Sequence, residues 1–265
     1  AEPSEELILL HAADLFPGYA VEQAASFRLT RNWDLDIDEE ESQDLLASIQ
    51  QELRRRDRGA VVRLELDAGA SEALEARLTQ AVSLGSADVY RVASPIQLQD
   101  LTALSEHDPR AENRVEPFVP TTPAAIAAAD SMFQLIAQGD VLLHHPYESF
   151  DPVVRFLEEA ADDPNVLAIK QTLYRTTGDS PVGRALVRAS ENGKQVAVLV
   201  ELKARLDEAN NIAWARRMEE SGVHVVYGLI GLKTHCKVTL VVRKEGNGIR
   251  RYVHLGTGNY NPATA

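Results

Sequence analysis

The stretch from which we read the fold of this chain is GLKTHCK, residues 231–237. It separates two runs typical of strands, HVVY at 224–227 and VTLVV at 238–242. Because side chains alternate along a strand, the His-x-Lys spacing at a strand start predicts that His235 and Lys237 share one face. An imidazole beside an ammonium group suits attack on an anionic phosphorus centre. The ring nitrogen would be the nucleophile, and the lysine would offset negative charge.

A second stretch suited to phosphate follows one further strand, GTGNYN at residues 256–261. Its glycines allow the backbone to approach a ligand closely, and its small polar groups can donate hydrogen bonds. A His-x-Lys pair alone occurs by chance, and the alternative is a surface histidine beside a solvated lysine. The glycine-rich block so soon after the pair favours the phosphate interpretation.

Composition places the chain among soluble globular proteins. Its 265 residues suggest one large or two medium domains, and 45% hydrophobic with 25% charged residues is ordinary. No apolar run approaches the roughly 20 residues that span a bilayer, and the first residues lack the basic region of a signal peptide. The single cysteine, Cys236, excludes an internal disulfide and is typical of a reducing compartment.

The net charge of −13 argues against nucleic acid as a partner, so an anionic substrate would need a local basic site. Such a cluster runs from residue 233 to residue 251, a segment that contains six lysines and arginines and a single acidic residue, Glu245. Its members are Lys233, Lys237, Arg243, Lys244, Arg250 and Arg251. The part from Arg243 to Arg251 is more typical of solvated charges at a hairpin tip.

The pattern of strands and helices predicts an α/β protein of two domains. Residues 1–120 form an α+β domain whose expected role is packing, partner contact or oligomerisation. Its elements are a strand at 27–31, a helix from Ser42, a strand at 61–66, a helix capped by Ser71 and a strand at 88–92. Prolines between 107 and 123 indicate a linker.

Residues 121–265 predict a series of βα units with helices on both faces of the sheet. The expected strands are 140–144, 166–174, 195–202 and 224–227, and the expected helices begin at Asp151, Ser180 and Asp207. Functional groups in such sheets gather at the carboxyl ends of the strands. Arg175 and Arg205 follow two of these ends, so we expect them to enter one crevice.

Six blocks, in order, resemble the bacterial polyphosphate kinase family of the histidine-phosphorylating type. They are FRLTR (27–31), HHPYESF (144–150), IKQTLYR (169–175), VELKAR (200–205), GLKTHCK (231–237) and HLGTGNYN (254–261). The resemblance implies a phospholipase D-like α/β/α sandwich in residues 121–265. It also implies reversible transfer of the γ-phosphate of ATP to inorganic polyphosphate, with Mg²⁺. Dimers or tetramers, and a cytoplasmic location with loose association with the inner face of the membrane, are implied too.

The resemblance also assigns residues. The phosphorylated histidine falls on His235, and the two magnesium- and phosphate-binding arginines fall on Arg175 and Arg205. A guanidinium has no lone pair for a metal, so we expect these arginines to bind phosphate oxygens while phosphate and water hold Mg²⁺. Lys237 is expected to neutralise the transferring group and Asn259 to orient it. Phosphate contacts are further expected at Lys233, Gly256 and Gly258.

Departures from the family keep two alternatives open. Phospholipase D motifs place an aspartate where this chain has Val242, which weakens, without removing, a phospholipase D-like phosphodiesterase or nuclease. The family's N-terminal helical domain and second catalytic domain have no counterpart in these residues. The sequence therefore predicts a fragment, which leaves a non-catalytic polyphosphate-binding module as the other alternative.

Four further residues of the motifs carry smaller expectations. Cys236 is expected to be a small buried residue beside the nucleophile, and His144 and His145 are expected to be structural. Tyr260 could stack on a nucleotide base.

Overall fold

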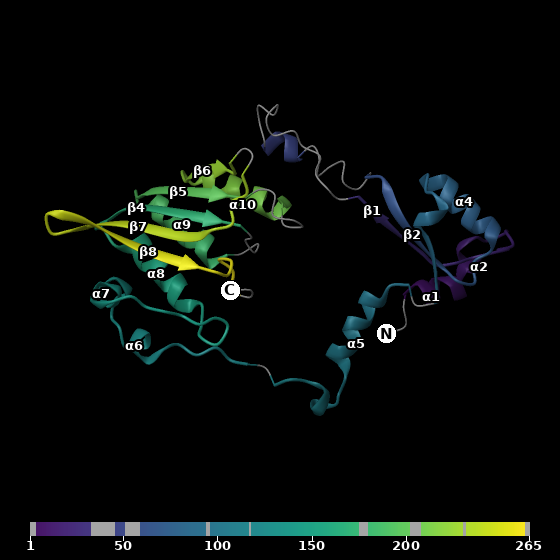
Figure 1. Ribbon diagram of the computed structural model, residues 1–265, viewed down its shortest axis with the longest axis horizontal. Coiled ribbons are helices and arrows are strands. Elements are labelled where there is room, and N and C mark those ends of the chain that lie inside the picture. The colour runs from purple at the N-terminus through teal and green to yellow at the C-terminus, as the bar shows by residue number, and fades with distance from the viewer. Residues whose placement is uncertain are drawn as a thin grey trace. The chain divides into compact units, whose positions relative to one another are not determined.

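The computed structural model describes residues 4–32, 46–50, 59–93, 96–116, 118–174, 180–201, 208–229 and 232–262. The chain divides into two compact units, each with its own sheet (Figure 1). The first comprises residues 1–36 and 51–116, and the second comprises residues 37–50 and 117–265. The helical residues 46–50 therefore group with the second unit. None of the described helices combines the length and hydrophobicity that crossing a bilayer requires.

The first unit is built on a three-stranded sheet with the order β1-β2-β3. Strand β1 (Phe27–Arg31) is antiparallel to β2 (Val61–Asp67), which is parallel to β3 (Val89–Val92). Its helices are α1 (Ser4–Leu10), α2 (Ala12–Leu15), α4 (Glu72–Val82) and α5 (Thr102–His107), with short 3₁₀ turns η1 (Ser86–Asp88), η2 (Leu98–Leu101) and η3 (Ala111–Asn113). Helix α4 begins as predicted, because the Ser71 hydroxyl accepts the Leu74 N–H at 3.2 Å.

The second unit is built on a five-stranded sheet with the order β6-β5-β4-β7-β8 (Figure 1). Its strands are β4 (Val166–Leu173), β5 (Gln195–Val200), β6 (His224–Tyr227), β7 (Lys237–Glu245) and β8 (Gly248–Gly256). Its helices are α6 (Ala124–Ala127), α7 (Met132–Gln138), α8 (Asp151–Asp162), α9 (Pro181–Glu191) and α10 (Glu208–Glu220). Strands β4, β5 and β6 are parallel, whereas β7 and β8 form an antiparallel hairpin against β4.

Helices α8, α9 and α10 form one layer against the sheet (Figure 1). Burial alternates along β5, where Val196, Val198 and Val200 are buried and the residues between them are less so. Helix α9 begins as predicted at Ser180, whose hydroxyl accepts the Gly183 N–H at 3.3 Å. The sequence predicted helices on both faces, but in the described part of the chain these three lie on one.

Strand directions bring several chain segments to one edge of this sheet. The parallel strands β4, β5 and β6 end at that edge, and the antiparallel β7 begins there and β8 ends there. The Thr172 hydroxyl joins β4 to the start of β7, since it donates to the Cys236 carbonyl at 2.7 Å and accepts the Val238 N–H at 3.0 Å. We call this the carboxyl edge.

The strand predicted at 140–144 is wrong. These residues follow Gly139 without joining either sheet, and the Leu142 side chain is 88% exposed. Instead of pairing with the edge strand β8, the segment lines a pocket beside Val253, His254 and Leu255 of that strand. The segment leads into the cis His145–Pro146 peptide.

Gly183 on α9 supports a prediction about packing in the second unit. A Cβ at this position would lie 2.8 Å from a ring carbon of the buried Trp214 on α10. Gly183→Ala should therefore lower the free energy of unfolding by about 1–3 kcal/mol, although alanine normally favours a helix over glycine. Urea denaturation measures the change. Gly139→Ala, where a Cβ has open space, is the control, and a Gly183→Ala protein of unchanged or higher stability would contradict this packing.

Candidate functional site

The centre of the carboxyl edge is the ring of Tyr174, the residue after β4. The exposed imidazole of His235 packs against it, with ring centroids 5.0 Å apart and planes at 83°. Such an edge-to-face contact limits the orientations available to the imidazole. His235 is thus accessible from solvent while its ring has a defined neighbour.

Two ammonium groups approach the same ring. The Nζ atoms of Lys233 and Lys237 lie 5.4 Å and 5.3 Å from the Tyr174 centroid, within the range of cation–π attraction. Lys237 is 5% exposed, whereas Lys233 is exposed. The histidine and both lysines therefore gather around one aromatic ring in a chain whose net charge is −13.

Burial lowers the pKa of the Lys237 ammonium, while the nearby Tyr174 and Cys236 act in the opposite direction. A cation with fewer surrounding water molecules interacts more strongly with an incoming anion. Lys237 is the first residue of β7, so the sheet itself holds this charge in place.

A buried carboxylate holds the segment that carries His235. Glu201, at the end of β5, is 4% exposed, and its Oε2 accepts the Thr234 N–H at 2.7 Å. The Asn211 amide on α10 donates to the carbonyls of Glu201, at 3.0 Å, and Tyr174, at 2.8 Å. The Asn211 amide thus links the residues that follow β4 and β5, next to the segment that carries the histidine.

Gly256 faces Lys237 directly across the β7–β8 ladder. A Cβ on Gly256 would lie 3.3 Å from His254 Cε1, which is tight, and 3.6 Å from the Lys237 Cβ, which is ordinary contact. Gly258 and Asn259 follow in the bend after β8. The structure therefore brings the glycine-rich block to the same edge as His235.

Tyr260 is not available to stack on a base, so that expectation is wrong. Its side chain is 3% exposed, and its hydroxyl lies 2.9 Å from Thr239 Oγ1 and 2.8 Å from His254 Nδ1. Burial raises the pKa of Tyr260 to about 12. The ring instead anchors the end of the glycine-rich block to β7 and β8.

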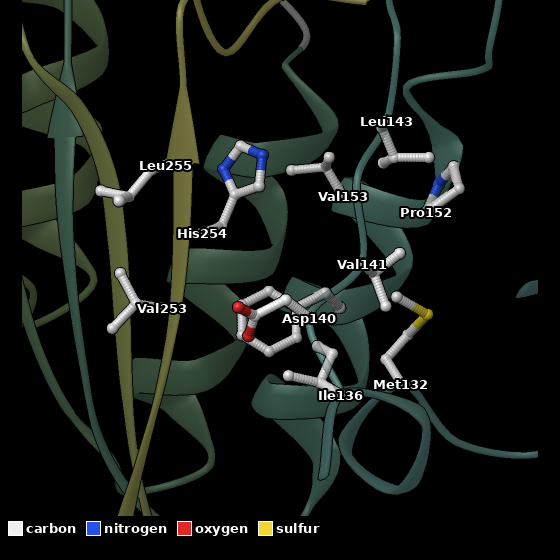
Figure 2. Close-up of a pocket in the computed structure, with 11 residues that line it drawn as sticks. Met132, Ile136, Asp140, Val141, Leu143, Pro152, Val153, Val253, His254 and Leu255 are labelled. Atoms are coloured by element: carbon white, nitrogen blue, oxygen red, sulfur yellow. The ribbon is translucent and has the colours of Figure 1, made fainter. Parts of the chain in front are cut away.

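His254 stands between this network and a pocket of about 360 Å³ (Figure 2). The pocket is lined mainly by apolar side chains, and His254 points from β8 toward Val153 on α8. Burial, with a smaller effect of His145, lowers the pKa of His254 to about 4. A neutral imidazole can accept the Tyr260 O–H at Nδ1, which is consistent with a structural role.

The smaller expectations have mixed outcomes. Cys236 is exposed, so its expected burial is wrong, because it precedes β7 on the outside of the edge. His145 is consistent with a structural role, since its Nδ1 lies 2.8 Å from the Glu148 carbonyl oxygen and its ring contacts Phe150.

Some predicted site residues lie outside the described residues, namely Arg175 and Arg205, together with Gly231 of the central motif. Within the described residues, no three histidine, cysteine or carboxylate side chains cluster as metal ligands. The described part of the edge is cationic, which fits phosphate oxygens rather than a directly bound metal ion. Sequence reasoning gave no role to Tyr174 or Asn211, although the strand-end position of Tyr174 was a usable signal.

Comparison with known proteins identifies the family. Residues 3–104 match the model of the polyphosphate kinase middle domain, and residues 131–265 match that of polyphosphate kinase C-terminal domain 1. The chain belongs to the polyphosphate kinase family.

Individual relatives agree with this assignment. The chain is 52% identical over 267 residues to a polyphosphate kinase of Mycolicibacterium gilvum and 51% identical over 269 residues to one of Streptomyces coelicolor. The crystal structure of a polyphosphate kinase from Porphyromonas gingivalis matches 97% of the chain with a TM-score of 0.74 and 31% identity. In each case the chain spans 36% of the relative's length.

The lowered pKa of His254 predicts a pH dependence of stability. Between pH 6.5 and 4 the unfolded chain binds a proton at this residue that the folded chain does not, so stability falls as the pH falls through this window. The loss due to His254 should reach up to about 3 kcal/mol. Urea denaturation as a function of pH measures it, and the His254→Gln variant should show a smaller loss. Equal pH dependence in the two proteins would contradict the burial of a neutral imidazole.

Proposed function

We propose that this chain is the part of a polyphosphate kinase that carries the phosphorylated histidine. The reaction is reversible transfer of the γ-phosphate of ATP to inorganic polyphosphate through phosphohistidine at His235. The observation that carries this proposal is that the accessible His235 ring, Lys233 and Lys237 all approach the Tyr174 ring at the carboxyl edge of the sheet. Membership of the polyphosphate kinase family supplies the substrate class.

The first step is in-line attack by an unprotonated ring nitrogen of His235 on the γ-phosphorus of ATP. A P–N bond forms, the bond to the β–γ bridging oxygen breaks, and ADP leaves with that electron pair. In the second step a terminal oxygen of polyphosphate attacks the same phosphorus, and the P–N bond breaks to regenerate the imidazole. The high transfer potential of the P–N bond is consistent with reversibility.

The remaining residues would neutralise and orient charge. Lys237, whose ammonium approaches the same Tyr174 ring as His235, would offset negative charge on the transferring group, and Lys233 would offer a second ammonium. The backbone at Gly256 and Gly258 allows phosphate oxygens to approach closely, and Asn259 is proposed to orient them.

For Arg175 and Arg205 we propose forked hydrogen bonds to phosphate oxygens. Mg²⁺ would then arrive with the phosphates of ATP and water, since the described edge offers no set of metal ligands. Assembly into dimers or tetramers, a cytoplasmic location and loose association with the inner face of the membrane are also proposed on family membership.

The phosphodiesterase alternative is not favoured. Val242 takes the place of the aspartate of phospholipase D motifs, and it pairs with Ala168 and Arg251 within the sheet. Hydrolysis of bis-p-nitrophenyl phosphate by the protein would revive that alternative. Polyphosphate binding without labelling by ATP would favour the non-catalytic module.

Replacement of His235 tests the covalent intermediate. The native polypeptide that carries this sequence should take up label from γ-³²P-ATP in an acid-labile, base-stable form. His235→Ala should abolish this label, because no other described residue is proposed to form the P–N bond. His224→Ala is the control, because His224 is exposed at the opposite end of a parallel strand. Label at the normal level in His235→Ala would contradict the assignment.

Replacement of Lys237 tests charge neutralisation. Lys237→Met keeps much of the side-chain volume and removes the charge, so the rate of His235 phosphorylation should fall by about 10- to 1000-fold. Rapid-quench measurements of label formation give the rate. Lys244→Met, an exposed lysine further along β7, should change it little. Equal rates in the two variants would remove Lys237 from the proposed site.

A further inference from the structure

We propose that Glu201 is a positioning residue for His235, and that it acts through the backbone N–H of Thr234. The proposal rests on the proposed function, since it concerns how the nucleophile of that reaction is placed. Glu201 itself would touch neither substrate nor the reacting atoms. Its carboxylate would fix the chain one residue before the nucleophile.

The contact that carries the inference is short and buried. Glu201 Oε2 accepts the Thr234 N–H at 2.7 Å, and the glutamate side chain is 4% exposed. A buried carboxylate is costly unless hydrogen bonds satisfy it, so its presence here calls for an explanation.

The carboxylate is rigidly held by the sheet. The Glu201 N–H donates to the Leu173 carbonyl at 2.9 Å, which extends the β4–β5 ladder by one residue. The Asn211 amide, 1% exposed, then binds the backbone carbonyls of both Glu201 and Tyr174. Glu201 and Tyr174 therefore follow directly after two adjacent strands whose ends are hydrogen-bonded to the same amide.

The two residues constrain His235 in complementary ways. Tyr174 packs against the imidazole ring and limits its orientation, whereas Glu201 fixes the backbone that leads into it. Attack on phosphorus needs the ring nitrogen in line with the leaving oxygen, and a displacement near 1 Å can reduce a rate about 100-fold. Loss of either constraint would widen the range of ring positions without removing the nucleophile.

Two conservative variants separate the effect of side-chain length from the effect of side-chain charge. Glu201→Gln keeps an oxygen at the same distance from the backbone and removes the charge, so it should retain the Thr234 hydrogen bond. Glu201→Asp keeps the charge but is one methylene shorter, so it should lose the bond. A positioning role predicts that Gln resembles the native residue and that Asp resembles Glu201→Ala.

The first readout is hydrogen–deuterium exchange at the Thr234 amide, resolved by mass spectrometry with residue-level fragmentation. Exchange should be at least about 10-fold faster in Glu201→Asp and Glu201→Ala than in the native protein, and little changed in Glu201→Gln. This readout is independent of phosphorylation, so it stands or falls separately from the proposed function. Circular dichroism checks that each variant is folded, and the Gln–Asp comparison remains decisive if Glu201→Ala is not.

The second readout is the rate of His235 phosphorylation in the native polypeptide. It should fall about 10- to 100-fold in Glu201→Asp, with the KM for ATP little changed, and recover in Glu201→Gln. The matched control is Glu159 on α8, whose Oε2 accepts the Met132 N–H at 2.8 Å in the same manner. Glu159→Asp should speed exchange at Met132 and leave both Thr234 exchange and the phosphorylation rate unchanged.

Two results would overturn the proposal. One is unchanged protection of the Thr234 amide in a folded Glu201→Asp protein. The other is a native rate of His235 phosphorylation in Glu201→Asp together with a much lower rate in Glu201→Gln. That result would show that the charge of residue 201 matters and its side-chain length does not. If Thr234 exchange behaves as expected but His235 takes up no label in the native protein, the role of Glu201 in holding the Thr234 backbone is supported and the proposed function fails.

Discussion

The antiparallel pairing of β7 with β4 is the constraint on which the site depends. Gln171 faces Thr239 across this pairing, so β7 begins where β4 ends. Tyr174 leaves β4 at the same edge that His235 reaches on entering β7. Had β7 continued the parallel series, its first residues would lie at the opposite edge, away from the ends of β4 and β5. One strand reversal therefore brings the motif to the carboxyl edge.

A local concentration of positive charge follows from this arrangement. Two ammonium groups and an imidazole surround the Tyr174 ring, and mutual repulsion between the lysines is offset by the electron-rich ring face. A phosphate group would offset it further, which gives the edge a physical reason to prefer anions in a chain of net charge −13. The buried Glu201 carboxylate is bound to the Thr234 backbone N–H rather than exposed to a ligand.

Local signals predicted the elements that local chemistry determines. Ser71 and Ser180 cap helices as expected, and the strand predicted at 166–174 is present at 166–173, because capping and apolar runs depend on neighbouring residues. Features set by partners distant in sequence could not be predicted. The run at 140–144 lines a pocket beside β8 instead of joining the sheet, and Tyr260 is buried by contacts with Thr239 and His254. The hydrogen bond of Glu201 to Thr234 and the contact of Tyr174 with His235 also join residues far apart in sequence, although the position of Tyr174 at a strand end was a usable signal.

The central claim is that the imidazole at this edge carries the phosphoryl group, and peptide mapping tests it most directly. After brief incubation of the native polypeptide with ATP, trypsin at neutral or alkaline pH releases residues 234–237, a peptide with a single histidine. Electron-transfer fragmentation then locates the phosphate within it. The account predicts phosphate on His235 alone. Phosphate on Thr234, or on a peptide from elsewhere in the protein with none at His235, would contradict it.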